Sequence, residues 1–121
     1  MSRILVVDDQ VEVAELVQAV LEDAGHVVEA VYGGQAALDR LAQTVYDLVV
    51  CDVRMPDVDG MAVYRAVARL APSRPLVLFM TGYSDGPAES EFLRTTAAVA
   101  LAKPLGIDKL LESVGRVLKA G

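Results

Sequence analysis

The sequence predicts one doubly wound α/β domain, in which a parallel sheet of five strands is covered by helices on both faces. Five short apolar runs alternate with five segments in which apolar residues recur every three or four positions. Strands that alternate with helices form parallel sheets through right-handed crossovers. The chain has 121 residues, the size of a single domain, with no internal repeat or low-complexity linker. We therefore expect residues 1–121 to form one domain.

The predicted strands are continuous apolar runs, which is typical of strands buried on both faces. After the third run, Met55-Pro56 prevents the strand from continuing, because proline lacks an amide hydrogen and restricts the residue before it. Asp57 and Asp59 suit the turn that follows. The expected strands are Ile4–Val7, Val27–Val31, Leu48–Asp52, Leu76–Met80 and Val99–Ala102.

The helices are predicted from apolar spacing and from the residues that end helices. The first runs to Ala24 and stops at Gly25, which suits a left-handed cap. For the fourth, Gly86 and Pro87 permit a helix only after them, and we expect a short, mobile helix that extends to Thr96. The expected helices cover residues 13–24, 36–41, 61–71, 87–96 and 107–118.

Polar side chains stand where four of the strands end. Asp8-Asp9 follows the first strand, Asp52 ends the third, and Thr81 and Lys103 follow the fourth and fifth. In open parallel sheets, the ligand crevice lies outside the carboxyl ends of the strands. We therefore expect these side chains to converge in one pocket.

Three carboxylates close together repel each other unless a cation lies among them. Magnesium fits a small set of oxygen ligands, because it keeps several waters and takes one or two carboxylates together with phosphate oxygens. A phosphoryl group brought to Asp52 could then be bound by the metal, by Lys103 and by the Thr81 hydroxyl. An aspartate can itself act as the nucleophile, and aspartyl phosphate is the product.

Composition excludes several other classes of function. Seventeen acidic and eleven basic residues give a formal charge of -6, so direct binding to nucleic acid is not expected. The apolar runs are too short for membrane insertion. The start of the chain shows no signal-peptide pattern, and its single cysteine cannot form an internal disulfide, so we expect a cytoplasmic protein.

Four motifs in order make the chain resemble the receiver (REC) domain of two-component response regulators, from about Arg3 to Leu118. They are Val6-Val7-Asp8-Asp9, the run Cys51 to Gly60 with Asp52 near its start, Met80-Thr81-Gly82 and Leu101-Ala102-Lys103-Pro104. Each motif alone is common. The resemblance implies a single CheY-like receiver domain over residues 1–121, with the flavodoxin-like strand order 2-1-3-4-5.

The resemblance also implies a role for each site residue. Asp52 would accept a phosphoryl group from a sensor histidine kinase or a histidine phosphotransfer protein. Asp9 and Asp52 would bind Mg²⁺ directly, Asp8 would help through water, and the backbone carbonyl of Arg54 would complete the metal site. Lys103 would pair with the phosphate, and Thr81 would move toward it. The Lys103-Pro104 bond would be cis.

Such a domain is a signalling protein and not an enzyme beyond self-phosphorylation and autodephosphorylation. By analogy with the family, the signal would leave by protein-protein contact through the fourth helix, fifth strand and fifth helix. The recipient would be a downstream protein or a C-terminal output domain absent from this sequence. Because the sequence starts with Met and ends just after the last helix, we expect a stand-alone regulator or an N-terminal module.

The sequence departs from the family pattern at Ala100, where receivers often carry a Tyr, Phe or His that rotates as a switch. Alanine has no rotamer to change, so the relay through this position is in doubt, whereas phosphorylation needs no side chain there. Tyr83, two residues after Thr81, is a hypothetical substitute.

Other interpretations of these residues remain open at this point. A haloacid-dehalogenase-type phosphoaspartate hydrolase also uses a strand-end aspartate and magnesium, but it requires a second aspartate where this chain has Arg54. A flavin binder would need a hydroxyl-rich loop where Asp8-Asp9 would repel the phosphate. Asp9 could be only a helix cap, and Lys103 only a surface lysine. We expect Tyr32, Tyr46, Tyr64 and Phe92 to be packing aromatics and Cys51 a core residue.

Overall fold

The computed structural model describes residues 2–70, 74–82, 86–96 and 98–120. Its five strands form one parallel sheet in the order β2-β1-β3-β4-β5, which confirms the predicted fold class. The order reverses between β1 and β3, which is where a ligand crevice is expected in such a sheet. The strands are β1 (Arg3–Val7), β2 (Val27–Val31), β3 (Leu48–Asp52), β4 (Leu76–Thr81) and β5 (Val99–Ala102).

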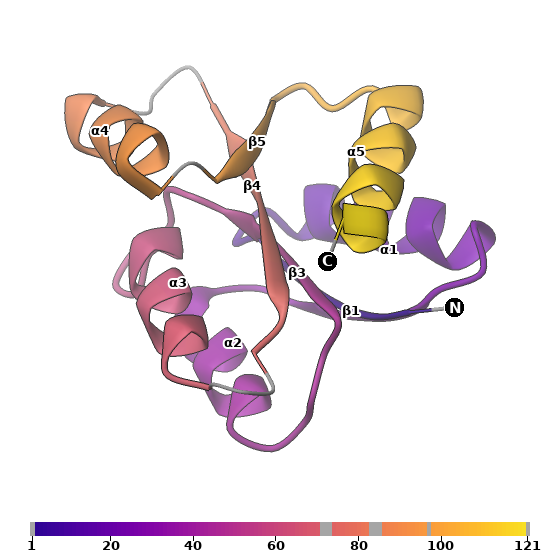
Figure 1. The fold of residues 1–121 in the computed structure, drawn as a ribbon, viewed down its shortest axis with the longest axis horizontal. Helices are drawn as coiled ribbons and strands as arrows, with labels where there is room; N and C mark the ends of the chain where they lie inside the picture. The colour runs from indigo at the N-terminus through magenta and orange to yellow at the C-terminus, as the bar shows by residue number, and fades with distance from the viewer. Residues whose placement is uncertain (1, 71–73, 83–85, 97, 121) are drawn as a thin grey trace.

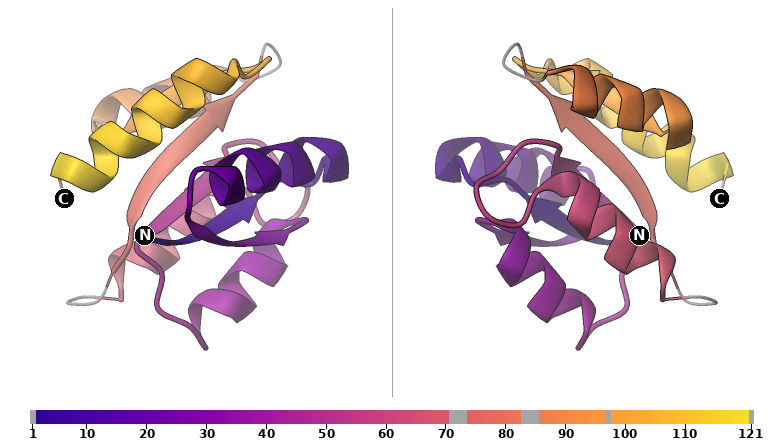
Figure 2. Two further views of the ribbon diagram at one scale, coloured as in Figure 1. Left: turned by 90° about the vertical axis from the view of Figure 1, so that its right-hand side faces the viewer. Right: turned by 90° about the vertical axis from the view of Figure 1, so that its left-hand side faces the viewer.

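Five helices cover the two faces of the sheet. The helices α1 and α5 lie on one face, and α2, α3 and α4 lie on the other (Figures 1 and 2). Among the described helices, none has the long apolar stretch that a membrane span requires. The helices are α1 (Val11–Asp23), α2 (Gly34–Leu41), α3 (Gly60–Ala68), α4 (Pro87–Thr96) and α5 (Ile107–Ala120).

Each face of the sheet has its own hydrophobic core, because alternate residues of a buried strand point to opposite faces. Ile4 and Val6 of β1 pack toward α1 and α5, and Leu5 and Val7 pack toward α2 and α3. Cys51 is fully buried on the α2 and α3 side, as expected from strand alternation. All five residues of β3 are buried, so this strand forms the centre of the molecule.

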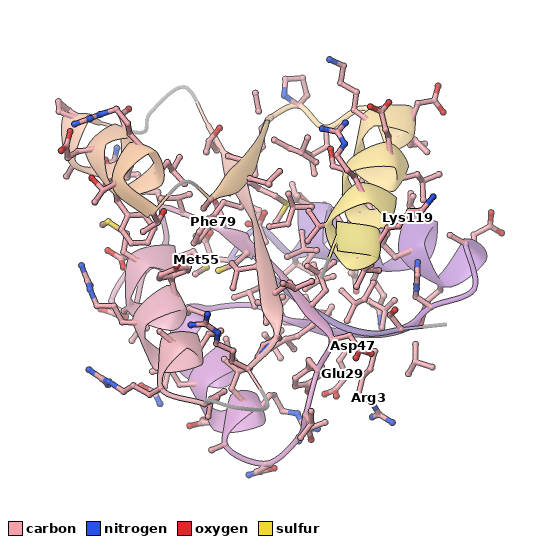
Figure 3. The ribbon with its side chains drawn as sticks, viewed as in Figure 1. Arg3, Glu29, Asp47, Met55, Phe79 and Lys119 are labelled. Atoms are coloured by element: carbon pink, nitrogen blue, oxygen red, sulfur yellow. The ribbon has the colours of Figure 1, made fainter. Side chains whose placement is uncertain are left out.

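An aromatic cluster attaches α4 to the rest of the domain. Figure 3 shows Phe79 on the side of the sheet that α3 and α4 cover. Its ring centroid lies 6.0 Å from that of Tyr64 and 5.6 Å from that of Phe92, and the last two centroids are 5.4 Å apart. This confirms the packing roles predicted for Tyr64 and Phe92. Such aromatic pairs add about 0.5–1.5 kcal/mol each beyond their buried area.

The other two tyrosines with a predicted packing role, Tyr32 and Tyr46, differ from each other. Tyr46 is buried as predicted, and its hydroxyl donates a hydrogen bond of 2.7 Å to Glu29, which also pairs with Arg40 at 2.8 Å. The packing role predicted for Tyr32 is wrong, because its side chain is 46% exposed. Figure 3 shows Glu29 near Arg3 and Asp47 at the end of the sheet where β1 and β3 begin.

The strand bounds agree with prediction to within one residue, and the larger differences are at helix ends. The helix α2 begins at Gly34, two residues earlier than expected. The early start brings its backbone against the loop between β3 and α3: a Cβ atom on Gly34 would lie 2.0 Å from the Val58 carbonyl oxygen. Asp59 caps α3 by accepting a hydrogen bond of 2.9 Å from the Ala62 amide, and Asp57 adopts a positive φ of 65° in the turn.

Candidate functional site

The register of the sheet brings the predicted strand ends to one edge. Val7 pairs with Cys51, so that Asp8 follows β1 beside the position of Asp52 in β3. Asp52 pairs in turn with Met80, one residue before Thr81. Because neighbouring parallel strands end together, the sheet itself places these polar residues around one point.

The backbone of Asp52 is held by the chain that reverses after it. The Val53 amide donates to the Met80 carbonyl at 3.1 Å, and the Gly60 amide donates to the Val53 carbonyl at 2.8 Å. Gly60 approaches so closely that a Cβ atom there would lie 2.4 Å from the Asp52 carbonyl oxygen. The start of α3 therefore packs directly against the backbone of Asp52 and Val53.

Lys103 reaches Asp52 and Asp8 from the end of β5. Its amide donates a hydrogen bond of 2.7 Å to the Thr81 carbonyl, and the Lys103-Pro104 peptide bond is cis, as predicted. The Nζ atom donates to Asp52 Oδ2 at 3.1 Å and lies 2.8 Å from Asp8 Oδ2. Lys103 is therefore part of the site and not a free surface lysine.

Three carboxylates form the acidic part of the site. One oxygen from each of Asp8, Asp9 and Asp52 lies within 4.8 Å of the others. Asp8 and Asp52 are buried, whereas Asp9 is exposed. The N-cap of α1 is Gln10, so Asp9 is not the N-cap residue. Asp8 Oδ1 accepts a hydrogen bond of 2.9 Å from the Gln10 amide, but Asp8 Oδ2 is buried with only the ion pair to Lys103 and no hydrogen bond.

The charges in this pocket are strongly perturbed. Burial, followed by the Asp8 carboxylate, raises the pKa of Asp52 to about 6, although Lys103 and the Arg54 amide act in the opposite direction. For Lys103, burial lowers the pKa, but the bonds and charges of Asp8 and Asp52 outweigh it, and the net pKa is raised. One lysine thus does not fully compensate two buried carboxylates.

The donor set fits a divalent cation. The ligands available are carboxylate oxygens, and one of them, Asp8 Oδ2, lies buried without a hydrogen bond. Magnesium prefers oxygen ligands, and a second cation would offset the residual negative charge. Asp8, Asp9 and Asp52 are therefore the residues that could hold Mg²⁺.

The raised pKa of Asp52 predicts that Asp52→Asn stabilises the metal-free protein at pH 7. The folded state binds this proton more tightly than the unfolded state, so wild-type stability falls as the pH rises from about 4 through about 6. Asparagine resembles the protonated form, and we expect a gain of about 1–3 kcal/mol in the free energy of unfolding. Urea unfolding followed by circular dichroism in EDTA, at pH 4 to 8, measures it.

Asp39→Asn is the matched control, because Asp39 is an exposed aspartate of α2 whose side chain accepts a hydrogen bond from Gln35. Its stability is expected to follow the wild-type pH dependence. If the stability of the wild type in EDTA did not change between pH 4 and 7, the raised pKa of Asp52 would be contradicted.

The other predicted site residues lie at the same edge of the sheet. Thr81 is the last residue of β4, and its carbonyl accepts a hydrogen bond from the Lys103 amide. The Arg54 amide donates to Asp52 Oδ1 at 3.4 Å, so the backbone of Arg54 borders the site. Ala100 is exposed on β5. Tyr83 lies outside the described residues.

One residue of the pocket, among the described residues, was not predicted from the sequence. Gln10 accepts a hydrogen bond of 3.0 Å from Lys103 Nζ through its side-chain oxygen Oε1. The two residues are 93 positions apart, so no local pattern indicates the contact. The available signal was its place directly after Asp8-Asp9, at the same strand end.

Comparisons with known proteins agree with this geometry. The family described as the response regulator receiver domain matches residues 4–115. The transcriptional regulatory protein ZraR of Salmonella typhimurium is 40% identical over 115 residues, which are 95% of this chain and 26% of ZraR. The chain thus spans about a quarter of that relative.

Solved structures show the same fold. A CheY-like response regulator receiver domain protein from Methanospirillum hungatei has a TM-score of 0.89 at 26% identity, covering 99% of this chain and 95% of that one. A putative response regulator from Chloroflexus aurantiacus has a TM-score of 0.84 at 31% identity, covering 98% of each chain.

Proposed function

Because this chain belongs to the response regulator receiver domain family, we propose that it is the phosphoacceptor of a two-component phosphorelay. Asp52 accepts a phosphoryl group from the phosphohistidine of a sensor histidine kinase or of a histidine phosphotransfer protein. The observation that carries the proposal is the Lys103 ammonium, held 3.1 Å from Asp52 Oδ2 and 2.8 Å from Asp8 Oδ2 at the carboxyl edge of the sheet.

The transfer needs no histidine or cysteine base. An Asp52 carboxylate oxygen attacks phosphorus, the bond from phosphorus to the imidazole nitrogen breaks, and the imidazole leaves with the electron pair. Lys103 binds an oxygen of the transferring group, and the Thr81 hydroxyl donates to another. Water later hydrolyses the acyl phosphate and regenerates the carboxylate. The protein is then a signalling phosphoacceptor and not an enzyme that acts on outside substrates.

The carboxylates supply the metal site in this proposal. Asp9 and Asp52 would bind Mg²⁺ directly, Asp8 would contribute through water, and the Arg54 carbonyl would complete the set. Bound Mg²⁺ would supply positive charge that offsets the negative charge of the phosphoryl group. The exposure of Asp9 leaves an entrance for a hydrated cation.

The signal is proposed to leave by protein-protein contact. ZraR is a transcriptional regulatory protein, and the match covers 26% of it, so the recipient here could be a C-terminal output domain or a separate downstream protein. Ala100 has no side chain that could rotate, so the movement of Thr81 must reach the surface by another route. As for response regulators in general, the protein is proposed to act in the cytoplasm with its kinase.

The haloacid-dehalogenase alternative finds no support. That class needs a second aspartate two residues after the nucleophile, and Arg54 occupies this position with its side chain exposed. An arginine cannot act as the general acid and base of a hydrolase at neutral pH.

Intact mass spectrometry tests the proposal. Wild type and Asp52→Asn are incubated with acetyl phosphate in Mg²⁺ and, in parallel, in EDTA. One phosphate adduct is expected on the wild type in Mg²⁺, and none on Asp52→Asn. Equal modification of the two proteins would place the acceptor elsewhere, and no adduct on either would refute phosphoacceptor function.

A further inference from the structure

Gln10 occupies an N-cap position without acting as a cap. The usual N-cap side chains accept a hydrogen bond from the first turn of the helix. Gln10, the N-cap residue of α1, makes no such bond, and its side chain reaches the end of β5 to accept from Lys103 Nζ at 3.0 Å. Its backbone amide donates to Asp8 Oδ1 at 2.9 Å. Gln10 is thus joined to both partners of the buried ion pair.

The contact completes the surroundings of the Lys103 ammonium. Lys103 Nζ donates hydrogen bonds to Asp52 Oδ2 and Gln10 Oε1 and forms an ion pair with Asp8 Oδ2, so that three oxygens lie within 3.1 Å of the ammonium. Two of these oxygens belong to buried carboxylates. The third belongs to a neutral and exposed side chain. The bond to Gln10 is therefore the one that Lys103 gives up most easily.

We propose that Gln10 occupies the Lys103 donor that a phosphoryl oxygen takes, so that release of this bond is part of phosphoryl binding. The inference rests on the proposed phosphoacceptor function and deepens it. In the unphosphorylated site, the carboxamide of Gln10 competes with the incoming group for one N–H of Lys103. Because a phosphoryl oxygen is anionic, it forms the stronger bond and displaces the amide. Gln10 then acts as a positioning residue that sets how readily the site is loaded.

Two substitutions of nearly equal size should have opposite effects. Gln10→Met keeps the length of the side chain and removes the acceptor, which leaves one Lys103 donor free. Gln10→Glu makes the competing acceptor anionic, strengthens its bond to Lys103 and repels the phosphoryl group. A purely structural role for Gln10 would move both variants in the same direction.

The experiment measures initial rates of phosphorylation by acetyl phosphate at limiting concentration in Mg²⁺, and the affinity for beryllium fluoride as a phosphoryl mimic by calorimetry. We expect both quantities to rise about three- to tenfold in Gln10→Met, the range that one net hydrogen bond corresponds to. Both should fall by at least as much in Gln10→Glu. Without any phosphodonor, Mg²⁺ affinity should be unchanged in Gln10→Met and higher in Gln10→Glu.

Gln18→Met is the matched control, because Gln18 is on the same helix and its side-chain amide donates a hydrogen bond to the Val28 carbonyl, away from the site. Its rate and affinity should equal those of the wild type. If the wild type is phosphorylated but Gln10→Met is equal or slower, or if Gln18→Met is accelerated equally, the role of Gln10 is refuted alone. A wild type that takes no phosphoryl group would refute the phosphoacceptor function and this inference with it.

Discussion

Lys103→Met is expected to slow phosphoryl transfer to Asp52 by about a hundredfold and to lower the free energy of unfolding in EDTA at pH 7 by about 3 kcal/mol. The first effect follows because the positive charge of Lys103 lies 3.1 Å from Asp52 Oδ2, where it can bind an oxygen of the transferring group. The second follows because removing the lysine leaves Asp8 and Asp52 together in a buried pocket without the positive charge of Lys103.

The loss of stability should depend on pH in a defined direction. Without Lys103, the pKa of Asp52 should rise beyond its wild-type value of about 6, because Lys103 lowers it. A carboxyl with a raised pKa in the folded state destabilises the protein as the pH rises through that value. The difference from wild type should therefore be small near pH 4 and large near pH 7 or 8, and Mg²⁺ should restore part of it.

Chemical denaturation and acetyl phosphate labelling, each with and without Mg²⁺, measure the two effects. Lys109→Met is the matched control, since Lys109 is an exposed lysine in the first turn of α5. We expect it to stay within about 0.5 kcal/mol of the wild type. If Lys103→Met were as stable as Lys109→Met at pH 7 in EDTA, the ion pairs of Lys103 with Asp8 and Asp52 would not contribute the expected amount of about 3 kcal/mol to the free energy of unfolding.

The sequence was sufficient to predict the strands and their polar ends, because both follow from local rules. A run such as Leu48–Asp52, apolar throughout and ended by a carboxylate, can be a central parallel strand and little else. In a parallel sheet the carboxyl ends of neighbouring strands lie at one edge. The proximity of Asp8, Asp52 and Lys103 can therefore be predicted without knowing their side-chain contacts.

What could not be predicted depends on contacts between distant parts of the chain. Gln10 has no residue type or spacing that marks it, and its role appears only when β5 places Lys103 beside it. Gly34 is a similar case. A side chain there would collide with the Val58 carbonyl in the loop between β3 and α3, and no local pattern in the sequence indicates this contact. Tyr32 was expected to pack, but it lies just after β2, the edge strand of the sheet, and is 46% exposed.

Gly60→Ala, which adds one methyl group next to the site, is expected to lower the stability of the protein strongly. The new Cβ atom would lie 2.4 Å from the Asp52 carbonyl oxygen and 2.8 Å from the Val53 Cα atom. Both are backbone atoms of the central strand and its continuation, so neither can move away without disturbing the hydrogen bond from the Gly60 amide to Val53. We expect a loss of about 2–4 kcal/mol in the free energy of unfolding.

Gly115→Ala separates this packing effect from the ordinary effect of replacing glycine. Gly115 lies within α5, and a Cβ atom there would contact nothing within 4 Å. Alanine favours a helix over glycine by about 0.5–1 kcal/mol, so this control should be more stable than the wild type. The same methyl group thus raises stability in α5 and lowers it at the start of α3.

The Gly60 variant also tests whether the support beneath Asp52 matters for its chemistry. Where Gly60→Ala still folds at low temperature, displacement of the Asp52 backbone should lower both Mg²⁺ affinity, measured by calorimetry, and the rate of acetyl phosphate labelling. Gly115→Ala should change neither. If Gly60→Ala had wild-type stability and wild-type labelling, β3 would tolerate the displacement of its backbone. The position of the Asp52 carboxylate would then depend on Lys103 and Asp8 and not on the start of α3.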